Sequence, residues 1–79
     1  MRLRALDISL RATSHLSDFL PEGGRMNLED GSRVQDVFSR LGINSDLVML
    51  IVVNGKLGDV DSLLENGAVL ELIPPISGG

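Results

Sequence analysis

The sequence predicts an α+β fold in which one helix packs across one face of a mixed sheet of four or five strands. Three observations predict it. A chain of 79 residues can bury only one modest core. Residues 32–42 show most clearly the helical spacing of apolar side chains together with a helix start and a helix stop. The other apolar segments are short and either alternate with polar residues or run without interruption, as strands do.

The first third of the chain predicts two strands joined by a loop. Within residues 2–11, apolar and polar side chains alternate from Leu6 to Arg11, which is the period of a half-buried strand. The phase breaks before Leu6, which allows a bulge or a late entry into the sheet. Residues 13–24 carry apolar side chains at helical spacing and then break at proline and glycine, which favours a short helical turn or loop. Met26 and Leu28 alternate with polar neighbours in a short second strand. The side chains of the first strand that should face the core are Leu6, Ile8 and Leu10.

The clearest helix is SRVQDVFSRLG, residues 32–42. Ser32 is the predicted N-cap, and Gln35 three residues later completes a capping box. Gly42 should end the helix in the left-handed conformation, and Ile43 should fold back toward Phe38. The predicted buried stripe consists of Val34, Val37, Phe38 and Leu41.

A hairpin follows the helix. Residues 47–53 are apolar at every position, which predicts a central strand covered on both faces or nearly so. Asn54 and Gly55 both tolerate positive φ and form the strongest short hairpin signal. Lys56 and Leu57 should begin a brief return strand.

The last elements complete the predicted fold. Leu63 and Leu64 should fill the core from a turn, and Gly67 leads into a final strand over residues 68–73. The order strand, strand, helix, strand, short strand, strand is the pattern of a β-grasp (ubiquitin-like) fold. We therefore expect a single β-grasp domain over residues 1–73 and an extended, flexible tail over residues 74–79.

Composition excludes several classes of protein. The net charge of −4 and the presence of two Phe without Trp or Tyr argue against a nucleic-acid-binding surface. No apolar run approaches the roughly 20 residues that cross a bilayer, so no membrane association is expected. The first residues lack a secretory signal, and a cytoplasmic location is the default expectation. Without cysteine, neither a disulfide nor a thiolate zinc site is available.

The side chains offer little catalytic chemistry. His15 is the only histidine, so it lacks a second ligand for a metal and a nucleophile to activate, and it is best interpreted as a solvated loop residue. Asp59, Asp61 and Glu65 fit capping and solvation better than metal binding. We expect no active site built from these side chains and no metal site.

The tail PPISGG carries the most unusual group in the chain, the backbone carboxylate of Gly79. The two prolines favour an extended, stiff stem. Past Ile76 no bulky side chain follows, so the end could thread a narrow channel and let another protein's groups approach closely. Two terminal glycines alone fit an idle end equally well. The residues predicted to thread are Pro74, Pro75, Ile76, Ser77 and Gly78.

Residues 53–79, VNGKLGDVDSLLENGAVLELIPPISGG, resemble the C-terminal third of the MoaD/ThiS family of ubiquitin-like sulfur carriers. The resemblance implies that the protein is a carrier and not an enzyme, with Gly79 as its working residue. An E1-like enzyme would use ATP to adenylate the Gly79 carboxylate. Sulfur from a cysteine desulfurase or other sulfurtransferase would then displace AMP and leave a thiocarboxylate. No cofactor bound by the chain itself is implied.

Within that family, Pro-Pro before the last four residues is similar to the small subunit of molybdopterin synthase. The resemblance then implies that the tail enters the large subunit and donates sulfur for the dithiolene that binds molybdenum or tungsten. Leu57 and Ile73 match positions at which the family contacts its partners, and burial in the core is an equally open interpretation of both. Other possibilities are a carrier for thiamin or another sulfur metabolite, a protein modifier conjugated to lysines through Gly79, and an interaction module with an idle tail.

Overall fold

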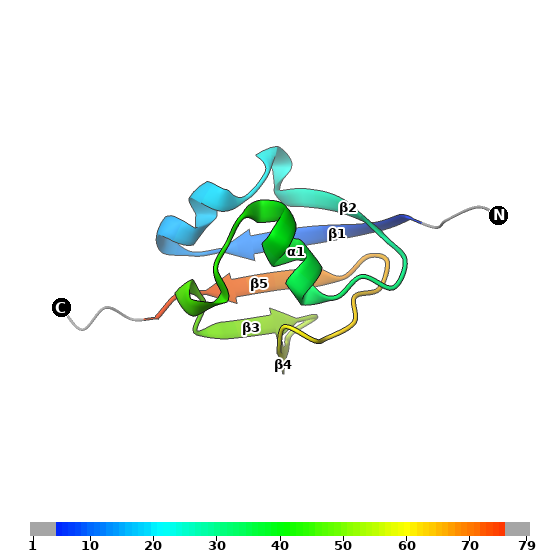
Figure 1. Cartoon of the computed structure of the whole chain (residues 1–79). Helices are drawn as coiled ribbons and strands as arrows, with labels where there is room; N and C mark the ends of the chain where they lie inside the picture. Colours follow the sequence, from blue (N-terminus) through cyan, green and yellow to red (C-terminus); the bar gives the residue numbers. More distant parts are fainter. Residues whose placement is uncertain (1–4, 76–79) are drawn as a thin grey trace.

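A five-stranded mixed sheet forms one layer of the protein and a single α-helix covers one of its faces (Figure 1). The computed structural model describes residues 5–75. The strand order is β2-β1-β5-β3-β4. β1 pairs in parallel with β5, and the other three pairs are antiparallel. The predicted β-grasp architecture is therefore confirmed.

The elements follow the predicted order, with short 3-10 helices between them. The strands are β1 (Ala5–Ala12), β2 (Arg25–Glu29), β3 (Leu50–Val53), β4 (Lys56–Gly58) and β5 (Val69–Ile73). The α-helix is α1 (Val34–Leu41), and the 3-10 helices are η1 (Ser14–Phe19), η2 (Glu22–Gly24) and η3 (Ser45–Leu47). Within residues 5–75, no helix is both long enough and apolar enough to cross a membrane.

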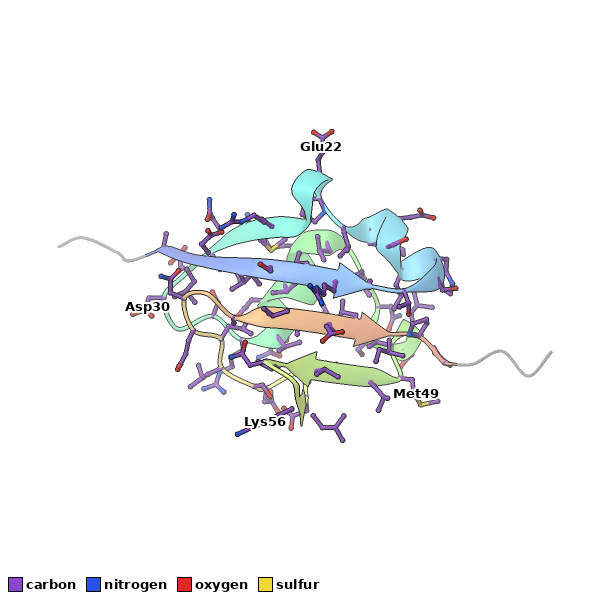
Figure 2. The ribbon with its side chains drawn as sticks, turned by 180° about the vertical axis from the view of Figure 1, so that it is seen from behind. Glu22, Asp30, Met49 and Lys56 are labelled. Atoms are coloured by element: carbon purple, nitrogen blue, oxygen red, sulfur yellow. The ribbon has the colours of Figure 1, made fainter. Side chains whose placement is uncertain are left out.

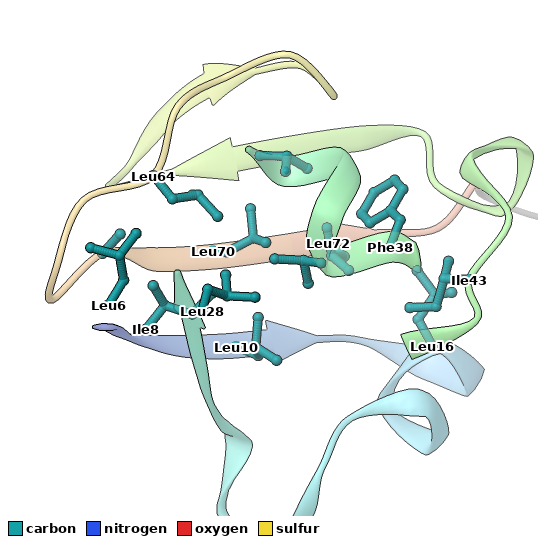
Figure 3. Close-up of a cluster of buried hydrophobic side chains, with 13 residues drawn as sticks. Leu6, Ile8, Leu10, Leu16, Leu28, Phe38, Ile43, Leu64, Leu70 and Leu72 are labelled. Carbon is teal, nitrogen blue, oxygen red and sulfur yellow. The ribbon is translucent and has the colours of Figure 1, made fainter. Parts of the chain in front are cut away.

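The core lies between α1 and the sheet, where apolar side chains from both layers meet (Figure 3). The predicted alternation in β1 is confirmed, because Leu6, Ile8 and Leu10 are all buried. β5 contributes Leu70 and Leu72, which are fully buried. The remaining buried apolar residues are Leu16, Leu28, Val34, Val37, Phe38, Ile43, Leu64 and Ala68.

The start of α1 differs from the prediction by one residue. Arg33, not Ser32, is the N-cap, and its backbone N–H donates to Asp36 Oδ2 at 2.8 Å. The Ser32 hydroxyl donates instead to the Glu29 carbonyl at 2.7 Å. The next two N–H groups, of Val34 and Gln35, donate to carbonyls of residues 62 and 60 at 3.0 and 2.9 Å. A loop distant in sequence thus supplies the acceptors that a capping side chain usually offers.

The end of α1 is as predicted. Gly42 is left-handed, with φ 73°, and the Ile43 N–H donates to the Phe38 carbonyl at 3.0 Å. Both Ile43 and Phe38 are buried, which supplies the hydrophobic contact of a Schellman ending.

Two predictions for the second half of the chain are wrong. The apolar run 47–53 is not a central strand covered on both faces, since only Leu50–Val53 form β3 and β3 lies second from the edge. The central position belongs to β5, which has β1 on one side and β3 on the other. Leu63 does not fill the core, because its neighbour Leu64 takes that position and Leu63 is 57% exposed.

Burial predicts a sharp difference in stability between two leucines of the sheet. Leu70→Ala should lower the free energy of unfolding by about 2–5 kcal/mol, because the cavity forms at a site with no exposed surface. Leu57→Ala should change it by no more than about 0.5 kcal/mol, because Leu57 is 74% exposed. Urea unfolding of the two variants measures both free energies. An equal loss of stability in the two variants would contradict the burial of Leu70 and the exposure of Leu57.

Candidate docking face and tail root

The face of the sheet opposite α1 is covered by no other element of residues 5–75, as the view from behind shows (Figure 2). We call it the open face. In β5 the buried side chains alternate with half-buried ones, so Val69, Glu71 and Ile73 lie on the open face. Residues that are Cα partners in neighbouring strands share a face. Leu50 and Val52 of β3 are partners of Ile73 and Glu71, and Leu57 of β4 is the partner of Val52.

An apolar patch covers the β5–β3–β4 part of the open face. It consists of Leu50, Val52, Leu57 and Ile73, and we refer to these four residues as the apolar patch. Leu57 is 74% exposed and Leu50 is 41% exposed. Val52 and Ile73 are half-buried. Met49, which is 62% exposed, lies beside the patch and donates its backbone N–H to the Ile73 carbonyl at 2.8 Å. Such contiguous exposed apolar surface on a small domain is typical of a protein-binding site.

The predicted Asn54–Gly55 turn places Leu57 in this patch. Asn54 and Gly55 have φ of 52° and 83°, as a two-residue hairpin requires. The Asn54 N–H donates to the Val69 carbonyl, and Asn54 Oδ1 accepts from the Val69 N–H, both at 2.8 Å. These two bonds attach the turn to the central strand, so the hairpin cannot swing away from β5 without breaking both.

The tail leaves the sheet next to the patch. β5 ends at Ile73, and proline cannot donate a further ladder hydrogen bond. Pro74 is buried and Pro75 is exposed, so the exposed chain begins at Pro75. We call Pro74 and Pro75 the tail root. Because β1 and β5 are parallel, the tail root lies at the same end of the sheet as the last residues of β1 (Figure 1). The other predicted threading residues, Ile76, Ser77 and Gly78, and the predicted working residue Gly79 lie outside the described residues.

A hollow of about 460 Å³ opens at the tail root. Its lining residues are Leu10, Arg11, Ala12, Thr13, Leu20, Glu71, Leu72 and Ile73. Leu10 and Leu72 are buried, so its accessible apolar side chains are those of Ala12, Leu20 and Ile73. It therefore joins the carboxyl ends of the two parallel strands to the apolar patch.

The charged side chains of the described residues make few contacts, and two of these join distant parts of the chain. Arg33 Nη1 donates to the Asp61 carbonyl at 2.7 Å. Arg25 pairs with Asp7 across β2 and β1, and this is the one salt bridge found within residues 5–75. Asp59 Oδ1 accepts from the Asp61 N–H at 2.8 Å, which is a local turn contact. His15 is exposed in η1. In the described part of the chain, no three His, Cys, Asp or Glu side chains are close enough to hold a metal ion.

Comparison with known proteins identifies the family of this chain. A family model described as the ThiS family matches residues 20–79. The chain belongs to the ThiS family. The resemblance to the MoaD/ThiS carriers is thus confirmed, and the matched segment includes the hairpin, β5 and the tail. No curated protein sequence matches this chain.

Solved structures show the same fold as this ThiS family chain. A putative molybdopterin converting factor subunit 1 from Pyrococcus furiosus has a TM-score of 0.65 and 20% identity, over 90% of this chain and 99% of that one. Small archaeal modifier protein 1 from Methanosarcina acetivorans has a TM-score of 0.66 and 17% identity, over 96% of this chain and 99% of that one. A chain in a complex of subunits 1 and 2 of molybdopterin-converting factor from Helicobacter pylori has a TM-score of 0.58 and 20% identity, over 94% of this chain and 100% of that one.

The structure brings together only part of the site that the sequence predicts. Leu57 is exposed and lies outside the core, and Ile73 is half-buried on the same open face. Whether the two residues dock a partner stays a prediction. Leu50 and Glu71 were missed. The signal for Leu50 was the uninterrupted apolar run at residues 47–53, which is more than one buried face needs. No local signal marked Glu71, whose neighbours across the sheet come from other strands.

Removal of the Asn54 side chain should loosen the hairpin that carries Leu57. Asn54→Ala loses the acceptor for the Val69 N–H and places alanine at a positive φ, so the free energy of unfolding should fall by about 1–3 kcal/mol. Asn54→Asp keeps an acceptor oxygen and tolerates this backbone, so its loss should be smaller. Urea unfolding measures the free energy of unfolding of both variants. An Asn54→Ala variant as stable as the wild type would show that the turn does not depend on this contact.

Proposed function

We propose that this ThiS family chain is a sulfur carrier whose Gly79 carboxylate is adenylated and then converted to a thiocarboxylate. The observation that carries the proposal is the family match, which runs through the tail to Gly79. The chain would have no enzymatic activity of its own. An E1-like enzyme would use the ATP, and we propose that the reaction takes place in the cytoplasm.

The chemistry needs a good leaving group, because a carboxylate is a poor electrophile. A Gly79 oxygen attacks the α-phosphate of ATP, and pyrophosphate leaves. A persulfide from a cysteine desulfurase or other sulfurtransferase then attacks the acyl carbon, and AMP leaves. A second thiol cleaves the new S–S bond, which leaves the thiocarboxylate and a disulfide of the two thiols. The chain's contribution is positioning, since its tail carries the reacting atom into another protein's active site.

The tail root supports this role because it limits where that active site can lie. Five residues, 75–79, follow the buried Pro74 in the sequence. Fully extended, they reach at most about 18 Å. An enzyme that acts on Gly79 must therefore approach the tail root closely, and the apolar patch lies there. We propose that Leu57 and Ile73 dock such partners.

For the acceptor, we propose the large subunit of molybdopterin synthase. The tail would deliver sulfur to a pterin precursor of the dithiolene that binds molybdenum or tungsten. Pro74 and Pro75 before the last four residues support this choice, and so does the fold shared with subunit 1 in the Helicobacter pylori complex. The fold is also shared with a small archaeal modifier protein, which supports conjugation to lysines as the second candidate. A carrier for thiamin or another sulfur metabolite is the remaining alternative.

Deletion of Gly79, or extension of the chain past it, should abolish adenylation. The variants keep every described contact of residues 5–75, so their thermal unfolding should match that of the wild type. ATP–pyrophosphate exchange with the E1-like enzyme of the same host measures the reaction. Glu22→Gln, an exposed change in η2, serves as the control that keeps activity. Undiminished exchange by the deletion variant would refute the proposal.

The product distinguishes a carrier from a modifier. In the carrier, one oxygen is replaced by sulfur within the tryptic peptide Leu57–Gly79, which contains no Met or Cys whose oxidation could imitate the mass change. In the modifier, the same peptide is found joined to lysines of other proteins.

Substitution in the apolar patch should weaken docking without loss of stability. Leu57→Asp should lower the affinity for the E1-like enzyme at least about 10-fold, since it places a charge in an apolar contact. Leu63→Asp is the matched control, because Leu63 is also an exposed leucine but lies outside the patch. Titration calorimetry measures both, and equal affinities would exclude Leu57 from the interface.

A further inference from the structure

Glu71 lies at the centre of the open face with apolar residues around most of it. Val69 and Ile73 precede and follow it on the same face of β5. Its Cα partner on β3 is Val52, and its Cα partner on β1 is Arg11. One carboxylate is therefore placed on the central strand, at the border of the apolar patch.

This carboxylate has no ionic partner in the described part of the chain. The salt bridge found there joins Arg25 to Asp7, and Glu71 is also absent from the side-chain hydrogen bonds there. Arg11 is exposed and does not come within 4.0 Å of the Glu71 oxygens, although the two residues are opposite one another. No described residue compensates the Glu71 charge, so the carboxylate depends on hydration in the free protein.

Docking removes that water. A partner that covers the apolar patch also covers Glu71, because Val52 and Ile73 are members of the patch and its direct neighbours. A carboxylate that loses its hydration without a new partner is strongly unfavourable. A purely apolar partner surface would therefore bind poorly, whereas a cation opposite Glu71 would compensate the loss.

The hollow at the tail root suits such a cation. Glu71 and Ile73 are both among its lining residues, together with Leu72, and its volume is about 460 Å³. An arginine or lysine side chain has an apolar stem and a charged end, so the stem can lie along the half-buried apolar lining residues, Ala12, Leu20 and Ile73, while the head reaches the carboxylate. An enzyme that takes up Gly79 must come within the approximately 18 Å that residues 75–79 can span, and the hollow lies at the tail root.

We propose that Glu71 is the specificity-determining contact of the docking face, and that the E1-like enzyme presents an arginine or lysine to it. This inference rests on the proposed function. It names a feature of the partner, a basic side chain within an apolar surface, that distinguishes cognate enzymes from others able to bind only the apolar patch.

The test measures adenylation by the purified E1-like enzyme of the same host, with carrier concentration varied to separate KM from kcat. Glu71→Gln, which is nearly isosteric, should raise KM for the carrier at least about 10-fold and leave kcat close to that of the wild type. Glu71→Arg should raise KM further, and Glu71→Asp should recover part of the loss. Thermal unfolding of each variant confirms that the fold is intact.

Glu65→Gln is the matched control that should leave KM unchanged, because Glu65 is also a carboxylate but does not line the hollow. Arg11→Gln is a separate test, because it removes the charge opposite Glu71 within the same chain. If the enzyme supplies the cation, Arg11→Gln should change KM by less than about 2-fold or lower it. A rise in KM equal to that of Glu71→Gln would show that Arg11 compensates Glu71 on docking, and would overturn the proposal. Unchanged KM for Glu71→Gln would also overturn it. If the wild-type chain itself is not adenylated, the proposed function fails.

Discussion

One helix has to cover a sheet of five strands, and it can cover only one face. α1 and the buried halves of β1 and β5 make the core, so the side chains that alternate with them remain outside whatever their chemistry. In β1 these outward residues are mostly polar, whereas in β3 and β4 they are leucine and valine. The apolar patch thus follows from a sheet with one unoccupied side and from a sequence that keeps part of that side apolar.

The parallel pairing of β1 with β5 determines where the tail leaves the fold. It places the end of the last strand beside the end of the first, between Arg11 and the apolar patch. A covalent tail and a docking face at the same edge can act together, because contact by one increases the effective concentration of the other. Neither needs to bind tightly alone.

Local signals in the sequence predicted the local structure. The alternation in residues 2–11, the glycine that ends α1 and the Asn54–Gly55 turn all depend on neighbours in the chain. The errors arose where distant residues decide. The N-terminus of α1 uses carbonyls of residues 60 and 62, and β5 became central because β1 and β3 both pair with it. The tail could be singled out from sequence for the same local reason, but Glu71 could not, because the neighbours that make it unusual come from other strands.

Pro74 fixes the point from which the tail leaves. Since that residue is buried, every enzyme that uses Gly79 must come within the same short distance of this point. Under the proposed function, an activating enzyme and an acceptor enzyme would then exclude one another sterically. The carrier would have to be released completely between being loaded and being emptied, so its turnover would depend on how quickly each complex dissociates. An interface of moderate affinity, readily reversible, suits such a shuttle better than a tight one.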